Sequence, residues 1–226
     1  MSITINKKAL QFLKRLEKNN TRDWFNEHKP EYKGLEVEVK QFYNILLDKL
    51  QVHDEIDRLK MFRIYRDVRF SKDKTPYNSH FSGYYGRRGA HLRGSYYLKI
   101  KPNNQSFLGV GFWNPNKEDL LRIRKEFEID ATEIRAILSE KTFAKTWGSF
   151  VGDEVKTAPR NFDKEHPNID LIKKKQFIFT KQFTDNEVLS STFIKQVDDA
   201  FQAIRPYLDY MSEVLTTDLN GVSLLD

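Results

Sequence analysis

The chain has 226 residues, of which 39% are hydrophobic and 31% are charged, a composition typical of globular proteins with a hydrophobic core and not of disordered chains. It contains no cysteine, which excludes disulfide bonds, thiol nucleophiles and thiolate zinc sites, and favours a cytoplasmic location. The net charge is +6, and no segment has the run of apolar residues that a membrane span or a signal peptide needs.

The first fifty residues are predicted to be helical. Apolar residues at positions 9, 12, 13 and 16 have the spacing of an amphipathic helix, which Asn19 and Asn20 are expected to end. Thr21 is suited to cap a short second helix. Pro30 is suited to the first turn of a third one, whose apolar residues keep helical spacing from 35 to 50.

The middle of the chain predicts strands joined by short loops, because aromatic and β-branched residues alternate with glycines. The clearest case is an antiparallel hairpin, with one strand over 96–101, a turn over 102–104 and a second strand over 107–113. Gly109 and Gly111 share one face of the second strand, where a missing side chain leaves room for a close neighbour or a ligand.

The rest of the chain returns mainly to helices. The elements expected there are a helix from Asn116 to 127, a helix over 131–138, an irregular stretch over 148–167, a helical turn over 169–173, a strand over 177–183 and a helix over 193–215. Pro206 should kink or break that last helix, because proline removes one backbone donor and crowds the preceding turn.

This order of elements indicates an α+β fold, with a mainly antiparallel central sheet packed by N-terminal and C-terminal helices. No repeat, linker or low-complexity tract divides the chain. We therefore expect a single domain over 1–226, which is helical over 1–55, sheet-rich over 60–115 and mixed over 116–226.

The positive charge is concentrated in residues 58–93, which contain ten basic and two acidic residues. The rest of the chain contains 28 basic and 30 acidic residues, so this window carries the whole positive excess. A localised positive field attracts anions such as phosphorylated metabolites, nucleic acid or an acidic protein surface. The alternative is that the arginines pair with acidic residues elsewhere in the fold.

Residues 62–77 are predicted to begin as a strand, which would place Arg66 on a face of otherwise apolar side chains. An unpaired buried charge costs several kcal/mol, so Arg66 should meet a carboxylate, a group of carbonyls or a bound anion. A bulge near Asp67 would instead turn Arg66 to the face that carries Arg63 and Arg69.

Three arginines within seven residues predict an anion site, because each guanidinium offers a planar fork of donors that matches phosphate or carboxylate. Asp67 can orient one arginine or act as a base, and its structural alternative is an ion pair that fixes the fold. The candidate ligand-binding residues are Arg63, Arg66, Asp67, Arg69, Lys74 and Tyr77.

This segment resembles the signature of a bacterial protein family, domain of unknown function 2461. The family pattern of Arg, Arg-Asp, Arg-Phe, Lys and Tyr is met by Arg63, Arg66, Asp67, Arg69, Phe70, Lys74 and Tyr77. The N-terminal stretch is similar to the same family through Phe12, Leu13, Leu16, Asn19, Asn20, Arg22, Trp24, Phe25, Lys29 and Tyr32. The resemblance implies a soluble bacterial protein of this size with the arginine segment at its centre of interest, and it implies no substrate or catalytic residue.

The five histidines have no metal-ligand spacing, so no metal and no cofactor are expected. His80 follows the arginine segment on an expected strand, where it can act as an acid or a base. Its structural alternative is a hydrogen-bonded histidine without a chemical role. The glycines around Arg87 and Arg88 indicate a flexible basic loop, but they lack the phosphate-loop and dinucleotide fingerprints.

Three classes of function fit these observations. The first is a pocket in which the arginines bind an anionic small molecule, with or without catalysis. The second is nucleic-acid binding by the basic, aromatic segment 58–97, which includes the loop at Arg87 and Arg88. The third is a structural or interaction module whose arginines are internal salt-bridge partners. An anionic small molecule is thus the expected partner, with nucleic acid as the alternative and no role for a membrane.

Overall fold

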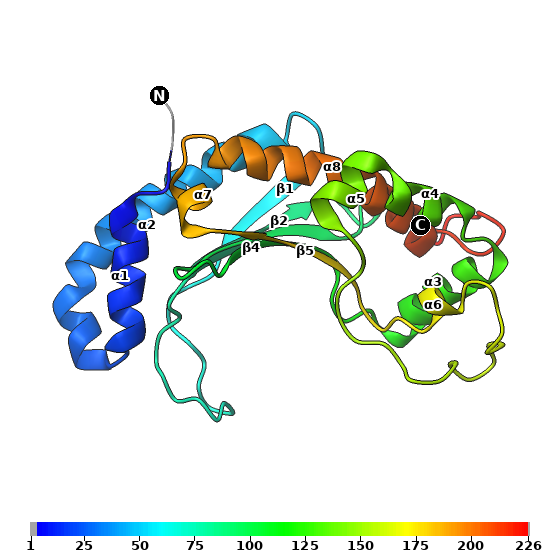
Figure 1. Cartoon of the computed structure of the whole chain (residues 1–226), viewed down its shortest axis with the longest axis horizontal. Coiled ribbons are helices and arrows are strands. Elements are labelled where there is room, and N and C mark those ends of the chain that lie inside the picture. The colour runs from blue at the N-terminus through cyan, green and yellow to red at the C-terminus, as the bar shows by residue number, and fades with distance from the viewer. Residues whose placement is uncertain (1–3, 226) are drawn as a thin grey trace. The chain divides into compact units, whose positions relative to one another are not determined.

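The computed structural model describes residues 4–225 and shows an α+β fold built on a five-stranded antiparallel sheet, in the order β1-β2-β3-β4-β5 (Figure 1). This confirms the predicted fold class. The strands are β1 (Ile56–Met61), β2 (Phe81–Arg87), β3 (Ser95–Ile100), β4 (Ser106–Phe112) and β5 (Phe177–Phe183). The helices are α1 (Lys7–Lys18), α2 (Arg22–Leu50), α3 (Lys117–Ile129), α4 (Thr132–Ser139), α5 (Lys141–Trp147), α6 (Ile169–Ile172), α7 (Asp185–Leu189) and α8 (Phe193–Thr216).

The chain divides into two compact units. Unit 1 contains the residues up to 85 together with 97–108 and 182–199. Unit 2 contains 86–96, 109–181 and the residues after 199. The single domain expected from the sequence stays a prediction. Within the described residues, no helix combines the length and the apolar character that crossing a membrane requires.

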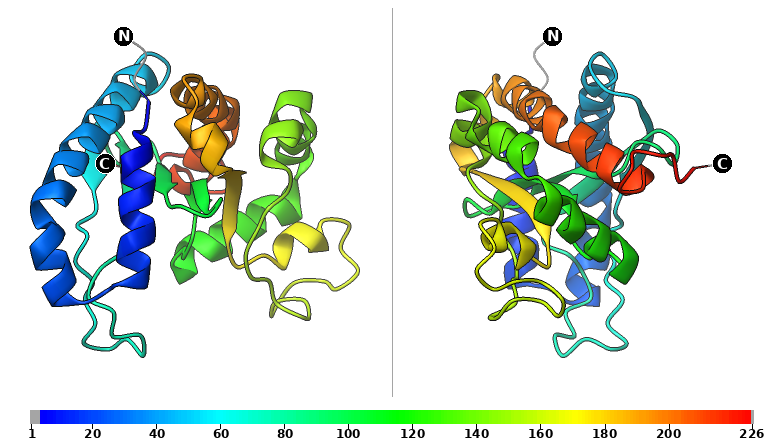
Figure 2. Two further views of the ribbon diagram at one scale, coloured as in Figure 1. Left: turned by 60° about the vertical axis from the view of Figure 1, so that its left-hand side comes forward. Right: turned by 90° about the vertical axis from the view of Figure 1, so that its right-hand side faces the viewer.

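The first two helices lie side by side in unit 1 (Figure 2). α1 ends where Asn19 and Asn20 predicted, and the hydroxyl of Thr21 accepts a hydrogen bond from the Trp24 N–H at 3.4 Å, which caps α2. The predicted start of a separate helix at Pro30 is wrong, because α2 continues through it. Proline removes one backbone donor, and the buried apolar stripe on both sides of Pro30 holds the two halves in one helix.

One face of the unit 1 sheet packs against α2. The Tyr43 hydroxyl on α2 donates to the Leu98 carbonyl at 3.0 Å, and the Tyr85 hydroxyl donates to the Tyr43 carbonyl at 3.1 Å. Side chains alternate between the two faces of a strand, so the residues next to these buried ones point to the opposite face. That opposite face carries polar and aromatic side chains that are exposed or half-buried.

Residues 62–80, which connect β1 to β2, form an extended loop that we call the arm, in which two segments run side by side. The strand predicted to start at residue 62 is wrong, since β1 ends at Met61 and the next 19 residues are irregular apart from one bridge between Tyr65 and Tyr77. The halves of the arm are joined by backbone hydrogen bonds, such as Arg66 N–H to Pro76 O at 2.9 Å. Figure 1 shows the arm, in teal, extending away from the strands.

The predicted hairpin is confirmed by β3 and β4, whose connection includes Asn103 and Asn104 in the left-handed backbone region. Gly111 has φ +118°, and a Cβ at this position would lie 2.1 Å from the Phe177 carbonyl oxygen. The missing side chain therefore admits a neighbouring strand, which was one of the two explanations that the sequence offered.

The predicted elements after β4 are confirmed in type, and α5 and α7 were not predicted. α8 continues through Pro206, so the proline does not break this helix. Within unit 2, apolar residues that flank Pro206, among them Ile204 and Leu208, are fully buried. Burial on both sides offsets the one hydrogen bond that proline removes, as it does in α2.

Candidate functional site

A cleft of about 490 Å³ lies between the arm and the adjoining strands of unit 1. It contains three of the six predicted ligand-binding residues, Arg63, Arg66 and Asp67, whereas the other three do not line it. The complete lining is Phe62, Arg63, Tyr65, Arg66, Asp67, Asn78, His80, Ser82 and Tyr97. Arginines, a histidine and aromatic rings therefore meet in one concave site.

The side chain of Arg66 connects the two halves of the arm near its tip. Its guanidinium donates to the Asp73 carboxylate at 2.5 Å, to the Thr75 carbonyl at 3.0 Å and also to the Thr75 hydroxyl. A longer contact of 3.4 Å reaches the Ser71 hydroxyl. Of the partners that the sequence predicted for Arg66, a carboxylate and a carbonyl are thus both present. Most of its hydrogen-bonding capacity is spent within the arm, although its charge stays beside the cleft.

Asp67 and Arg69 form an exposed ion pair. The two carboxylate oxygens of Asp67 accept from Arg69 Nε at 3.0 Å and from Arg69 Nη2 at 2.6 Å. The hydrogen bonds from Arg69 hold the pKa of the Asp67 carboxyl below its ordinary value. Asp67 therefore stays ionised and bound to its neighbour, which is the structural role that the sequence allowed for it.

Lys74 and Tyr77 also serve the arm itself. Lys74 Nζ donates to the Val68 carbonyl at 3.0 Å across the tip. Tyr77 is buried, and its ring stacks on that of Phe25 with centroids 4.0 Å apart. Its backbone N–H donates to Asn20 Oδ1 at 3.1 Å, so Tyr77 fixes the arm to the helical part of unit 1.

Arg63 differs from the other two arginines of the arm. Its side chain is exposed at the cleft and makes no hydrogen bond or ion pair with any residue in the part of the chain that the structure describes. Its backbone carbonyl accepts from Asn78 Nδ2 at 3.3 Å, which positions the backbone of Arg63 against the opposite half of the arm. The N–H groups of the Arg63 guanidinium are therefore available to bind a ligand in the cleft.

His80 lies on the wall of the cleft, immediately before β2. Burial is the main cause that lowers the pKa of this imidazole to about 4, and the positive charges of Lys99, Lys101 and Arg66 lower it further. His80 is therefore neutral at physiological pH. The contribution of these cations to the lowered pKa also indicates that the electrostatic potential at this wall of the cleft is positive.

We expect His80 to make the protein less stable in acid. Its folded pKa of about 4 is below the unfolded value of 6.5, so the unfolded state binds more protons between these two values. The stabilisation is complete above pH 6.5 and is lost as the pH falls toward 4. The free energy of unfolding can be measured with urea at pH 7 and at pH 4.5. Between these two pH values it should fall by about 2 kcal/mol less in His80→Gln than in the wild type. Equal losses in the two proteins would contradict the assignment.

Two of the arginines that the sequence placed in a basic loop have acidic partners. Arg87 is the last residue of β2, and its fully buried side chain donates to Asp209 and, at 3.1 Å, to the Ser212 hydroxyl. Arg93 pairs with Asp119 at 2.6 Å. Arg87 and Arg93 are therefore salt-bridge partners within unit 2, as the third class of function required.

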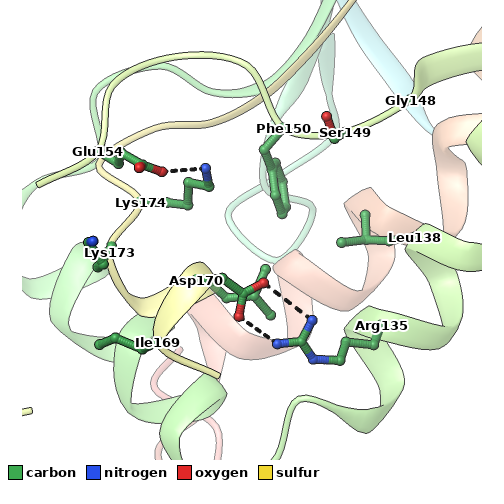
Figure 3. Close-up of a pocket in the computed structure, with 11 residues that line it drawn as sticks. Arg135, Leu138, Gly148, Ser149, Phe150, Glu154, Ile169, Asp170, Lys173 and Lys174 are labelled. Carbon is green, nitrogen blue, oxygen red and sulfur yellow. Dashed lines mark hydrogen bonds and ion pairs between the residues drawn. The ribbon is translucent and has the colours of Figure 1, made fainter. Parts of the chain in front are cut away.

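Unit 2 contains a second cavity, of about 540 Å³, which the sequence did not reveal (Figure 3). The Arg135 guanidinium faces the Asp170 carboxylate at 2.7 Å, and Lys174 Nζ contacts Glu154 at 2.6 Å. Two of its three cationic side chains are thus neutralised by acids. Its walls come from α4, α6, the irregular stretch between α5 and α6 and the residues that follow α6, so no single motif could have predicted it.

No cluster of three or more histidine, aspartate or glutamate side chains within residues 4–225 is arranged to hold a metal ion. Residues 8–210 match the family model described as "Conserved hypothetical protein (DUF2461)". The match covers the whole arm and the whole lining of the cleft. No curated protein and no solved structure matches the chain.

Proposed function

The chain belongs to the DUF2461 family of conserved hypothetical proteins, and we propose that its cleft binds an anionic small molecule that carries a phosphate or a carboxylate group. The observation that carries this proposal is the free guanidinium of Arg63 in the cleft that His80 also lines. Arginine offers two parallel donors to an oxyanion and stays charged at any working pH.

The charges around the cleft favour an anion. Arg63 and Arg66 line it, together with one acidic residue, Asp67. Arg66 is paired with Asp73 and Asp67 with Arg69, so Arg63 supplies the positive charge that has no ion-pair partner. Lys99 adds to the positive potential, and its own pKa is lowered, mainly by burial and also by the charge of Lys101. A bound anion would be attracted by the charge of Arg63 and, at longer range, by that of Lys99.

The arm supports binding by keeping its own shape. The hydrogen bonds of Arg66 within the tip and the stacking of Tyr77 on Phe25 fix both ends of the arm. A site that is ordered before the ligand arrives loses less conformational entropy on binding. Arg66, Asp67 and Tyr77 are thus proposed as positioning residues, and Arg63 as the residue that contacts the anion.

His80 is the group in this cleft that can accept a proton from a ligand at neutral pH, because it is neutral there and its ring lines the cleft. Asp67 is less suited to this role, since both of its carboxylate oxygens accept from Arg69. A proton-transfer step would therefore involve His80, and the proposal itself concerns binding.

A titration followed by NMR tests this proposal. The imidazole signals of His80 are recorded between pH 3.5 and 8, first in chloride and then in pyrophosphate at the same ionic strength. A bound anion favours the protonated imidazole, so the pKa of His80 should rise from about 4 by at least one unit in pyrophosphate. An unchanged titration curve for His80 at saturating pyrophosphate would refute anion binding in this cleft.

A further inference from the structure

Beside the cleft, the face of the unit 1 sheet that points away from α2 carries four aromatic rings in contact with one another. Phe62 lies 5.9 Å from Tyr84 and 6.3 Å from Tyr97, measured between ring centroids, and Tyr97 lies 5.6 Å from Phe107. These residues follow β1 or belong to β2, β3 and β4, so the rings form a row across the strands. We call this row the aromatic face.

Cations accompany the aromatic face. The Arg58 guanidinium lies 5.9 Å from the Tyr84 ring centroid, Lys60 Nζ lies 5.9 Å from that of Phe62, and Lys99 Nζ lies 5.6 Å from that of Phe107. Arg58 and Lys60 are exposed. Strands β1 to β4 contain one acidic residue, Asp57. Because Arg58, the next residue, points to the aromatic face, Asp57 points to the opposite face. The face is therefore both aromatic and positively charged.

The burial pattern supports an outward role for this face. On the other side of the same strands, Tyr85, Leu98 and Leu108 are fully buried. On the aromatic face, Phe62 is 45% exposed and the other three rings are half-buried. A row of rings that served only as a core would be buried like the residues opposite it.

We infer that the aromatic face binds single-stranded nucleic acid, with bases stacked on its rings and backbone phosphates near Arg58, Lys60 and Lys99. Stacking on aromatic side chains combined with positive charge along the backbone is the way in which proteins hold single strands. A duplex is a poorer fit, because its base faces are covered within the stack.

The inference rests on the anion site of the proposed function, but it assigns that site to a backbone phosphate of the bound strand instead of a free small molecule. Phe62 and Tyr97 belong to both the aromatic face and the cleft lining, so the two sites are continuous. A phosphate at Arg63 would thus lie next to a base that stacks on Phe62. Tyr84 and Phe107 lie outside the cleft lining, which allows the two parts to be tested separately.

Binding of fluorescein-labelled dT12 and U12 oligonucleotides, measured by fluorescence anisotropy, tests the inference. We expect binding that weakens steeply with rising salt and that is at least tenfold tighter than binding of the matching duplex. Tyr84→Leu and Phe107→Leu should each weaken oligonucleotide binding by about tenfold, as expected for the loss of one stacked base. Trp113→Leu removes an exposed aromatic ring that is not one of these four and should change nothing.

The response of His80 to pyrophosphate separates the two proposals. Tyr84→Leu and Phe107→Leu should leave that response unchanged, because neither residue lines the cleft. Arg58→Ala, a change at an exposed side chain, should reduce the slope of log affinity against log salt by about one unit even if the aromatic variants fail to fold. The inference is wrong if the duplex binds as tightly as the single strand, or if the oligonucleotides bind no tighter than pyrophosphate. Neither of these results would contradict the proposed anion site. If pyrophosphate also leaves His80 unchanged, both are wrong.

Discussion

Replacing Arg87 with alanine is expected to lower the free energy of unfolding by about 3 kcal/mol, the largest stability effect that we predict. The Arg87 side chain is fully buried, and its loss leaves the Ser212 hydroxyl and the Arg93 carbonyl without this donor. It also leaves a cavity and removes one partner of the Asp209 carboxylate. Urea unfolding of the wild type and of Arg87→Ala at pH 7 measures the effect.

Arg205→Ala is the matched control for this experiment. Arg205 pairs with the same carboxylate, Asp209, at 2.9 Å, but its side chain is 31% exposed. Ion pairs near the surface contribute little, so this variant should lose less than about 1 kcal/mol. Similar losses in Arg87→Ala and Arg205→Ala would mean that Arg87 is not an internal strut.

Replacing Arg63 with alanine should weaken the binding of pyrophosphate by about 10- to 100-fold. This range corresponds to the loss of one or two hydrogen bonds to a charged group. The free energy of unfolding should barely change, because the exposed Arg63 side chain makes no hydrogen bond or ion pair with the described residues and its attraction to Asp67 is screened by solvent. Isothermal titration calorimetry at constant ionic strength measures the affinity.

Lys72→Ala tests whether position or net charge determines this affinity. It removes one positive charge from the same arm, but the exposed Lys72 does not line the cleft. We expect its effect to be less than about threefold, the size of a screened long-range interaction. Equal effects of the two substitutions would show that pyrophosphate binds to the arm nonspecifically.

Much of the fold could be predicted because local patterns determine it. Asn103 and Asn104 adopt the left-handed backbone that the hairpin turn needs, and asparagine tolerates that region better than most residues. The separate helix predicted to start at Pro30 was wrong, and α8 is not broken at Pro206. The cost of a proline is local, whereas the burial that offsets it involves residues far apart in the sequence. The position of a proline in the sequence therefore does not by itself show whether a helix ends there.

The candidate site was predicted in part. The arginine segment does lie at a cleft. The pairing of Arg66 with Asp73 was not predicted, because it depends on a turn at the tip of the arm, where the alternation of apolar residues had indicated a strand. Apolar residues at every second position suggested a strand with a buried face, but Phe70 is 97% exposed and no sheet covers that side. Tyr97 was placed on a strand of the hairpin, but its contribution to the cleft required the three-dimensional structure.

Locating a heavy oxyanion in crystals of this protein tests the central claim most directly. Crystals grown without sulfate or phosphate would be soaked in tungstate, and the anomalous signal would position the anion. We expect the anion within hydrogen-bonding distance of the Arg63 guanidinium, between the arm and His80, and we expect this site to be lost in Arg63→Ala. Tungstate bound only at the tip of the arm or on other surface cations, with the cleft beside Arg63 empty at full soaking concentration, would contradict it.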